Sequence, residues 1–203
     1  FVSAIEAKDL IDEPVSVILK KYNIGTEDFF LVSNQFWQHK NHVCLIEAIK
    51  IAKQKYKKNI VAVCTGYTSD LRKNDYFESL IYMIKQNNLQ DNIKILGLIP
   101  RDEQLKLMET AIAVVQPSLF EGWGTVVEDA KTLGKIIVMS DIEVHKEQRD
   151  SKSILFAKDS AEDLANILIG LWDQYNGKAK VYSYGIHKKR EYGKAFFDAI
   201  TSK

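Results

Sequence analysis

The stretch AVVQPSLFEGWGTVVEDAKTLGKIIVM, residues 113–139, decides the fold. It passes from the apolar run 113–115 through a loop with two glycines into a helical pattern at 126–133, and then into a second apolar run at 135–139. Continuous apolar runs of this length are typical of strands buried on both faces, and a helix between two such strands is typical of a parallel crossover. The stretch therefore predicts one strand–helix–strand unit of a parallel sheet.

The same alternation extends in both directions from this unit. Further strands are expected at 29–33, 59–64, 93–96 and 154–156, and helices at 14–22, 43–52, 77–84, 101–110 and 164–172. Each crossover between parallel strands is expected to be right-handed, which places helices on both faces of the sheet. The sequence therefore predicts an α/β fold, a Rossmann-like doubly wound parallel β-sheet.

The composition is that of an ordinary globular protein. Of 203 residues, 46% are hydrophobic and 27% are charged, which excludes disordered and collagen-like classes. Lys and Arg (28) balance Asp and Glu (27) to a formal charge of +1, so nucleic acid is not expected as a partner. No uncharged apolar run approaches the ~20 residues of a membrane span. Cys44 and Cys64 lie in apolar runs, so we expect buried, reduced thiols and a cytoplasmic protein.

The ends of the chain carry weaker patterns than its middle. Nothing before Phe29 resembles a signal peptide, and the first residue is Phe1 rather than Met, so we expect the chain to be a piece of a longer protein. Residues 1–28 are expected to form an interdomain linker or amino-terminal extension, and 29–178 the ligand-binding domain. Residues 179–203 are expected to form a helix that either crosses to an amino-terminal domain or packs locally.

Ligands of doubly wound sheets bind beyond the carboxyl ends of the strands. That edge carries the loops 34–41, 65–75, 97–101, 116–125 and 140–148. The fourth of these loops contains two glycines and leads into a helix, whose first N–H groups and partial positive charge attract anions. We therefore predict a phosphate site at the start of that helix.

Three acids lie in or near this glycine-rich loop. Thr125 and Glu128 have the spacing of a capping box, in which Thr125 caps the helix and Glu128 bonds back to it. Asp129 lies in the first turn, where an acid stabilises the helix through its dipole by about 0.3–1 kcal/mol. Glu121 precedes a glycine and caps no obvious helix, so a functional role is favoured for it.

Lys40 lies in the loop that follows the first strand. A cation at this edge of the sheet would neutralise a diphosphate and stabilise the charge that develops as the diphosphate departs. His39 and His42 flank Lys40, but no third ligand of suitable spacing is near them, so no metal is expected.

Three segments, in this order, resemble the carboxyl-terminal, donor-binding half of retaining, family 4-type (group 1) glycosyltransferases of the GT-B fold. They are NQFWQHKNH at 34–42, ILGLIP at 95–100 and PSLFEGWGTVVEDA at 117–130. The resemblance extends from about residue 29 to residue 172 and is most specific in the third segment. The family pattern there has two glutamates separated by seven residues, and Glu121 and Asp129 occupy those positions.

The resemblance implies a role for each matching residue. Lys40 and Glu121 would be catalytic, Lys40 acting on the diphosphate and Glu121 on the donor sugar. The second acid, Glu128 or Asp129, would bind the ribose hydroxyls. Further contacts with the nucleotide sugar are implied for Asn34, Gln35, Leu98, Ile99, Gly122, Trp123, Gly124, Thr125 and Val126.

Within that set, the resemblance implies that the backbone of Leu98 and Ile99 meets the base, residues 122–124 hold sugar hydroxyls, and the amides of Thr125 and Val126 meet the diphosphate. Gln35 stands where family members often carry an Arg, so Lys40, helped by Arg101, would neutralise the diphosphate. The loop 140–148 lacks the glycine pair of the family, and no role is assigned to it.

The implied activity is transfer of a sugar from a nucleoside-diphosphate sugar to a glycan or lipid-linked acceptor, with retention of configuration and without a metal or other cofactor. An absent amino-terminal domain of the same protein would bind the acceptor, and the isolated chain would be inactive. A catalytically silent nucleotide-sugar-binding or regulatory module is the alternative. A receiver-type domain is disfavoured, because the acidic cluster that follows its first strand is absent.

These features also imply a setting for the protein. The resemblance implies polysaccharide biosynthesis, in the cytoplasm. The lysines at 50–58 leave peripheral contact with the inner membrane face open, although a solvated helix face also explains them.

Overall fold

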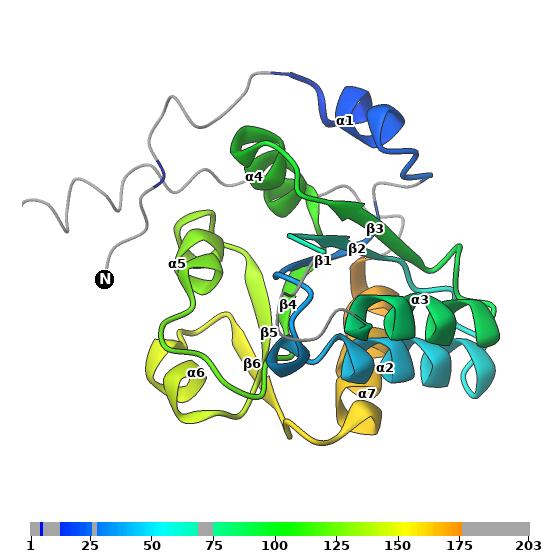
Figure 1. The fold of residues 1–203 in the computed structure, drawn as a ribbon. Helices are drawn as coiled ribbons and strands as arrows, with labels where there is room; N and C mark the ends of the chain where they lie inside the picture. The colour runs from blue at the N-terminus through cyan, green and yellow to red at the C-terminus, as the bar shows by residue number, and fades with distance from the viewer. Residues whose placement is uncertain (1–4, 6–12, 26–27, 69–74, 176–203) are drawn as a thin grey trace, which may run out of the picture.

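The strands of the sheet lie where the apolar runs predict them. The computed structural model describes residues 5, 13–25, 28–68 and 75–175, and Figure 1 shows their arrangement. The strands are β1 (Phe30–Ser33), β2 (Ala62–Thr65), β3 (Ile93–Gly97), β4 (Ala113–Gln116), β5 (Ile136–Ser140) and β6 (Ser153–Phe156).

The sheet has the strand order β3-β2-β1-β4-β5-β6, and its five pairings are all parallel. In the register, Leu31 of β1 lies beside Val63 on one side and Val114 on the other. The direction of winding reverses between β1 and β4, and the carboxyl ends of the strands at such a switch point form the usual ligand crevice. The predicted Rossmann-like doubly wound sheet is confirmed.

Helices cover both faces of this sheet. They are α1 (Val15–Lys21), α2 (His42–Gln54), α3 (Tyr76–Gln86), α4 (Arg101–Thr110), α5 (Thr125–Thr132), α6 (Glu143–Gln148) and α7 (Ala161–Tyr175), with a 3-10 turn, η2, at Gln38–Lys40. In Figure 1, α2, α3 and α7 lie on one face, and α4, α5 and α6 lie on the other. Because both faces are covered, β1, β2 and β4 are buried at every residue.

Two segments that we expected as loops contain short helices. The loop after β1 contains η2, and the loop after β5 contains α6. The buried residues of α6 are His145 and Gln148, both polar, so a search for apolar periodicity does not find this helix. In addition, β2 begins at Ala62 rather than at the predicted residue 59. The carbonyl of Val61, just before the strand, already accepts a hydrogen bond from the Phe30 N–H of β1.

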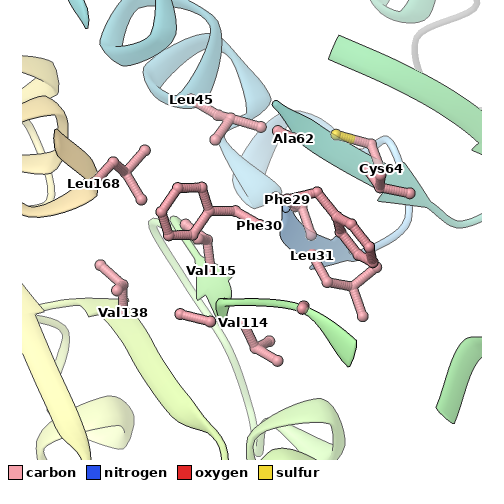
Figure 2. Close-up of a cluster of buried hydrophobic side chains, with 14 of the residues drawn as sticks. Phe29, Phe30, Leu31, Leu45, Ala62, Cys64, Val114, Val115, Val138 and Leu168 are labelled. Atoms are coloured by element: carbon pink, nitrogen blue, oxygen red, sulfur yellow. The ribbon is translucent and has the colours of Figure 1, made fainter. Parts of the chain in front are cut away.

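The core is centred on β1. Phe30 is fully buried, and Figure 2 shows its ring close to Leu45 of α2 and Leu168 of α7. The ring of Trp172 lies 6.3 Å from it, centroid to centroid. Burying an apolar side chain of this size contributes about 1.5–3 kcal/mol. This packing makes the central strand a rigid support for the loops that follow β1 and β4.

Both cysteines are buried and unpaired, as predicted. Burial raises the pKa of the Cys44 thiol to about 11 and that of Cys64 to about 12. Both therefore remain protonated at neutral pH, and neither is an activated nucleophile.

The two ends of the chain differ in what the structure describes. Helix α1, within the segment expected as a linker, buries Ile18 and Leu19. Lys21, the last residue of α1, and Tyr22, which follows it, each bond to Glu103 of α4 at 2.5 Å, so α1 lies against the domain. The helix expected at 179–203 lies outside the described residues.

The lysines at 50–58 all have partners within the chain. Lys50 pairs with Glu47, Lys55 with Glu162 and Lys58 with Asp173, while Lys53 and Lys57 donate to the backbone carbonyls of Asn88 and Gln54. Much of the charge of this cluster is therefore compensated locally. Among the helices described, none is both long enough and apolar enough to span a bilayer.

Candidate functional site

A cavity of about 290 Å³ opens at the carboxyl ends of β1, β2 and β3, beside the start of α5. Its lining includes these residues of the predicted site: Asn34, Gln35, Lys40, Leu98, Ile99, Thr125 and Val126. Predicted residues that do not line it are Glu121, Gly122, Trp123, Gly124, Glu128 and Asp129. The fold thus brings three of the five loops at this edge, and the start of α5, to one cavity.

Sequence reasoning missed several residues of the lining. They are Ser33, Trp37, Thr65, Gly66, Tyr67 and Gln104. Ser33 ends the predicted strand 29–33, and Thr65 begins the loop that follows the predicted strand 59–64, so both lie where the rule that ligands bind at carboxyl ends points. Gln104 lies on α4, and no motif indicates it.

Gly66 allows two of these loops to approach closely. Its φ is +142°, and a Cβ atom there would lie 2.1 Å from the carbonyl oxygen of Asn34. The Asn34 N–H donates to the Thr65 carbonyl at 3.0 Å, and the Gly66 N–H donates to Gly97 at 2.9 Å. Only glycine combines this conformation with this contact, and Gly66 is one of the residues that line the cavity.

Asn34, a residue of the cavity lining, carries a side-chain donor without a partner in the described part of the chain. Its side chain is buried, and Nδ2 has no hydrogen-bond partner among the described residues. A buried donor without a partner is costly, which is typical of a group that a ligand satisfies.

Lys40 and Glu121 form an ion pair at the edge of this cavity. The Lys40 Nζ lies 2.6 Å from Oε1 and 2.7 Å from Oε2 of Glu121, and Ser118 Oγ donates to Oε1 at 2.7 Å. The two side chains are only 14% and 10% exposed. The Leu119 N–H also donates to the His39 carbonyl at 2.8 Å, which joins the two loops. The structure therefore places the two predicted catalytic side chains in direct contact.

The start of α5 differs from the predicted capping box. Gly124, not Thr125, is the N-cap residue, and no side chain of the helix caps it. The prediction was wrong because Glu128 turns away, to Gln148 Nε2 at 2.8 Å and Lys131 Nζ at 3.2 Å. Instead, Gln148 accepts a hydrogen bond from the Gly124 N–H at 3.1 Å. The N–H groups of Thr125 and Val126 have no acceptor among the described residues.

Glu128, in the first turn of α5, and Asp129, which follows it, point in different directions. Asp129 is buried and accepts a hydrogen bond from Arg101 at 2.5 Å, on the side of α4. Arg101 also donates to Gln104, which lines the cavity. Glu128 faces α6 instead. Of the two acids, Asp129 is therefore the one on the cavity side.

A second cavity, of about 480 Å³, is lined in part by Glu121. Leu119 and Phe120 line it together with the residues at the start of α6. Gly122 in the same loop is exposed and Trp123 is half-buried. The ion pair thus has one partner in each lining: Lys40 lines the cavity at the start of α5, and Glu121 lines the second cavity.

The histidines next to Lys40 have packing roles. The ring of His42 is fully buried and stacks on Phe36, 4.3 Å between centroids, and that of His39 tilts against Trp37. Burial, together with the charge of Lys40, lowers the pKa of His42 to about 3. Within the described residues, no three His, Cys, Asp or Glu side chains are grouped as a metal site would need.

A family model for glycosyl transferases group 1 matches residues 16–188. This chain belongs to the group 1 glycosyl transferases. The family predicted from the three segments of sequence is therefore confirmed.

Individual proteins of known sequence or structure resemble this glycosyltransferase chain over most of its length. It is 31% identical over 142 residues to the O-antigen chain mannosyltransferase RfbU of Salmonella typhimurium (strain LT2), which covers 66% of this chain and 38% of that protein. The structure of Anabaena HepE with UDP and glucose has a TM-score of 0.72 and 18% identity, over 98% of this chain and 53% of that one. WaaG, a glycosyltransferase involved in lipopolysaccharide biosynthesis, has a TM-score of 0.60 and 15% identity, over 98% and 55%. The chain thus spans 38% of RfbU and about half of the two solved structures.

Proposed function

We propose that this chain is the donor-binding half of a retaining GT-B glycosyltransferase and that its cavity holds the nucleoside diphosphate of a nucleotide sugar. One observation carries the proposal: Thr125 and Val126, whose N–H groups have no acceptor among the described residues, line the same cavity as Lys40. Two backbone donors at a helix start and a nearby cation are typical of an anion site. The crystal structures of HepE with UDP and with UDP-glucose support this class of ligand.

For the rest of the nucleotide, the proposal follows the roles that the family resemblance implies. Asp129, on the cavity side of α5, binds the ribose hydroxyls, and Arg101 holds its carboxylate in place. The backbone of Leu98 and Ile99 meets the base. The free amide of Asn34 donates to the nucleotide sugar.

The sugar lies towards Glu121, beyond the diphosphate. There the acceptor hydroxyl replaces the nucleoside diphosphate at the anomeric carbon, through a state with oxocarbenium character. Lys40 and the start of α5 stabilise the negative charge that grows on the departing diphosphate, without a metal. Glu121 and the backbone of 122–124 hold the hydroxyls of the donor sugar.

The acceptor binds to a second domain of the same protein, which is consistent with the part of its relatives that this chain spans. The names of RfbU and WaaG support a glycan or lipid-linked acceptor in polysaccharide biosynthesis. We place the reaction in the cytoplasm, with peripheral contact at the membrane where such acceptors lie.

A thermal-shift panel of UDP, GDP, ADP and their common sugars tests the proposal. One of these ligands, at ~100 times its Kd, is expected to stabilise the chain by about 2.7 kcal/mol. Lys40→Ala is expected to lose most of this shift, whereas Lys50→Ala, which removes a lysine paired with Glu47 on α2, is expected to keep it. A panel without any stabilising nucleotide would contradict the proposal.

A further inference from the structure

Gln148, the last residue of α6, makes three hydrogen bonds beneath the glycine-rich loop. Its Oε1 accepts from the Gly124 N–H at 3.1 Å, and its Nε2 donates to the Gly124 carbonyl at 3.1 Å. Nε2 also donates to Glu128 Oε1 at 2.8 Å. The side chain is 2% exposed, so water does not compete for these bonds.

These bonds fix the peptide groups on both sides of Gly124. Gly124 is the N-cap residue of α5, and its carbonyl also accepts from the N–H of Val127 at 3.0 Å. Gly124 has no side chain that could cap the helix, so the side-chain amide of Gln148, on α6, supplies the capping hydrogen bonds instead. The two N–H groups that follow, of Thr125 and Val126, belong to residues that line the cavity.

The fit around Gly124 is tight. A Cβ atom at this position would lie 3.0 Å from Val127 Cγ2 and 3.1 Å from Gln148 Oε1. The backbone and the amide are therefore in direct contact, and neither can move far without the other. An apolar residue could fill the space of Gln148, but it could not hold the orientation of the Gly124 peptide.

We propose that Gln148 is a positioning residue for the diphosphate. By hydrogen bonding to the peptide groups on both sides of Gly124, it orients the N–H groups of Thr125 and Val126 towards the cavity. This inference rests on the proposed function, since it concerns the same site. It assigns a role in the loop after β5, outside the segments that resemble the family pattern.

The test compares Gln148→Met with the unchanged full-length protein. The probe is whichever of UDP, GDP and ADP binds the unchanged protein most tightly, together with the matching nucleoside, whose Kd is obtained by competition. Gln148→Met is expected to weaken the nucleoside diphosphate at least ~10-fold, because bonds to a charged group are lost or misdirected, and to change the nucleoside less than ~2-fold. Gln148→Asn has a side chain one methylene shorter, so its amide cannot reach Gly124, and it is expected to give the same result. This variant replaces Gln148→Met in the test if Gln148→Met does not fold.

Asn92→Leu is the matched control. Asn92 is another fully buried amide, bonded to Asn59 and to the carbonyl of Ile60, but it precedes β3 at the opposite edge of the sheet. It is expected to lower stability and to leave the ratio of the two affinities unchanged.

The outcomes separate the two proposals. If the unchanged protein binds the nucleotide, and the Gln148 variants lose nucleoside and diphosphate affinity equally or not at all, the positioning role is overturned while the proposed function stands. If the unchanged protein binds none of the three nucleotides, both are overturned.

Discussion

At the residue scale, the two side chains assigned to catalysis neutralise each other. Lys40 contacts both oxygens of Glu121, and both side chains are largely buried. In such a place an unpaired charge is costlier than an ion pair. Under the proposed function, we therefore expect a diphosphate at the start of α5 to compete with Glu121 for Lys40 and to leave the carboxylate free for the hydroxyls of the sugar.

Glu121→Gln is consequently expected to have opposite effects on binding and on transfer. Removing the carboxylate charge leaves Lys40 to the diphosphate alone, so the Kd of the nucleoside diphosphate is expected to fall by roughly 3- to 10-fold. Transfer is expected to slow, since an uncharged amide replaces the carboxylate that the proposal places at the donor sugar. Calorimetric titration and initial rates measure the two effects. Glu143→Gln, which removes a 91% exposed acid of α6, is the control and leaves the Kd unchanged; weaker binding by Glu121→Gln would contradict the competition.

His42 makes the stability of the chain depend on pH. Its pKa in the folded protein is about 3, well below the ordinary value near 6.5, because burial and Lys40 disfavour the imidazolium. Between these two values the unfolded chain binds a proton that the folded chain does not, so stability falls as the pH falls below about 6.5. The loss from this residue amounts to about 2 kcal/mol at pH 5.

His42→Phe keeps the stacking on Phe36 and removes this titration. The variant is expected to lose less stability than the unchanged protein between pH 7 and pH 5, by up to about 2 kcal/mol in urea unfolding. An equal loss in both proteins would show that His42 does not titrate in this way.

At the scale of elements, the cavity depends on how closely the loops after β1 and β2 approach. Gly66 holds a φ of +142° against the carbonyl of Asn34, and a Cβ has no room there. Gly122, in the glycine-rich loop, has nothing within 4 Å of such a Cβ. The two glycines thus differ in what they contribute: Gly66 allows a close approach, and Gly122 leaves space beside the loop.

Gly66→Ala is expected to destabilise the chain by at least about 2 kcal/mol, since it adds both backbone strain and a clash with the backbone. Nucleotide binding is expected to weaken as well, because Asn34 must move. Chemical unfolding and the thermal-shift panel measure the two losses, with Gly122→Ala as the control for stability. If both variants are equally stable, the close approach is not essential.

At the scale of the whole molecule, a measurement of sugar transfer distinguishes a transferase from a silent binding module. The chain joined to its acceptor-binding half is expected to transfer sugar, whereas the chain alone is expected only to bind the donor. In the joined protein, Lys40→Ala is expected to lower turnover at least ~100-fold, about 2.7 kcal/mol, because the departing diphosphate loses its cation. Release of the nucleoside diphosphate measures turnover. A loss below threefold would remove Lys40 from catalysis, and an inactive joined protein would favour the silent module.

The sheet and most of its helices could be predicted from the order of the residues. Runs such as 113–115 and 135–139 are apolar throughout because both faces of a doubly wound sheet are covered, and this pattern needs no knowledge of the partners of each residue. The position of the cavity followed from the same pattern, since the carboxyl ends of parallel strands share one edge. The glycine-rich loop and Lys40 could be predicted as site residues because both follow strands at this edge.

The contacts at this edge were decided only by the folded chain. Lys40 and Glu121 are 81 positions apart, Arg101 and Asp129 are 28 apart, and Gln148 and Gly124 are 24 apart. Hydrogen-bond partners at such separations depend on the packing of whole elements, so local spacing favoured a capping box where the fold supplies Gln148 instead. Polar residues that are buried because of one specific partner, as on α6, leave no periodic pattern for a sequence to reveal.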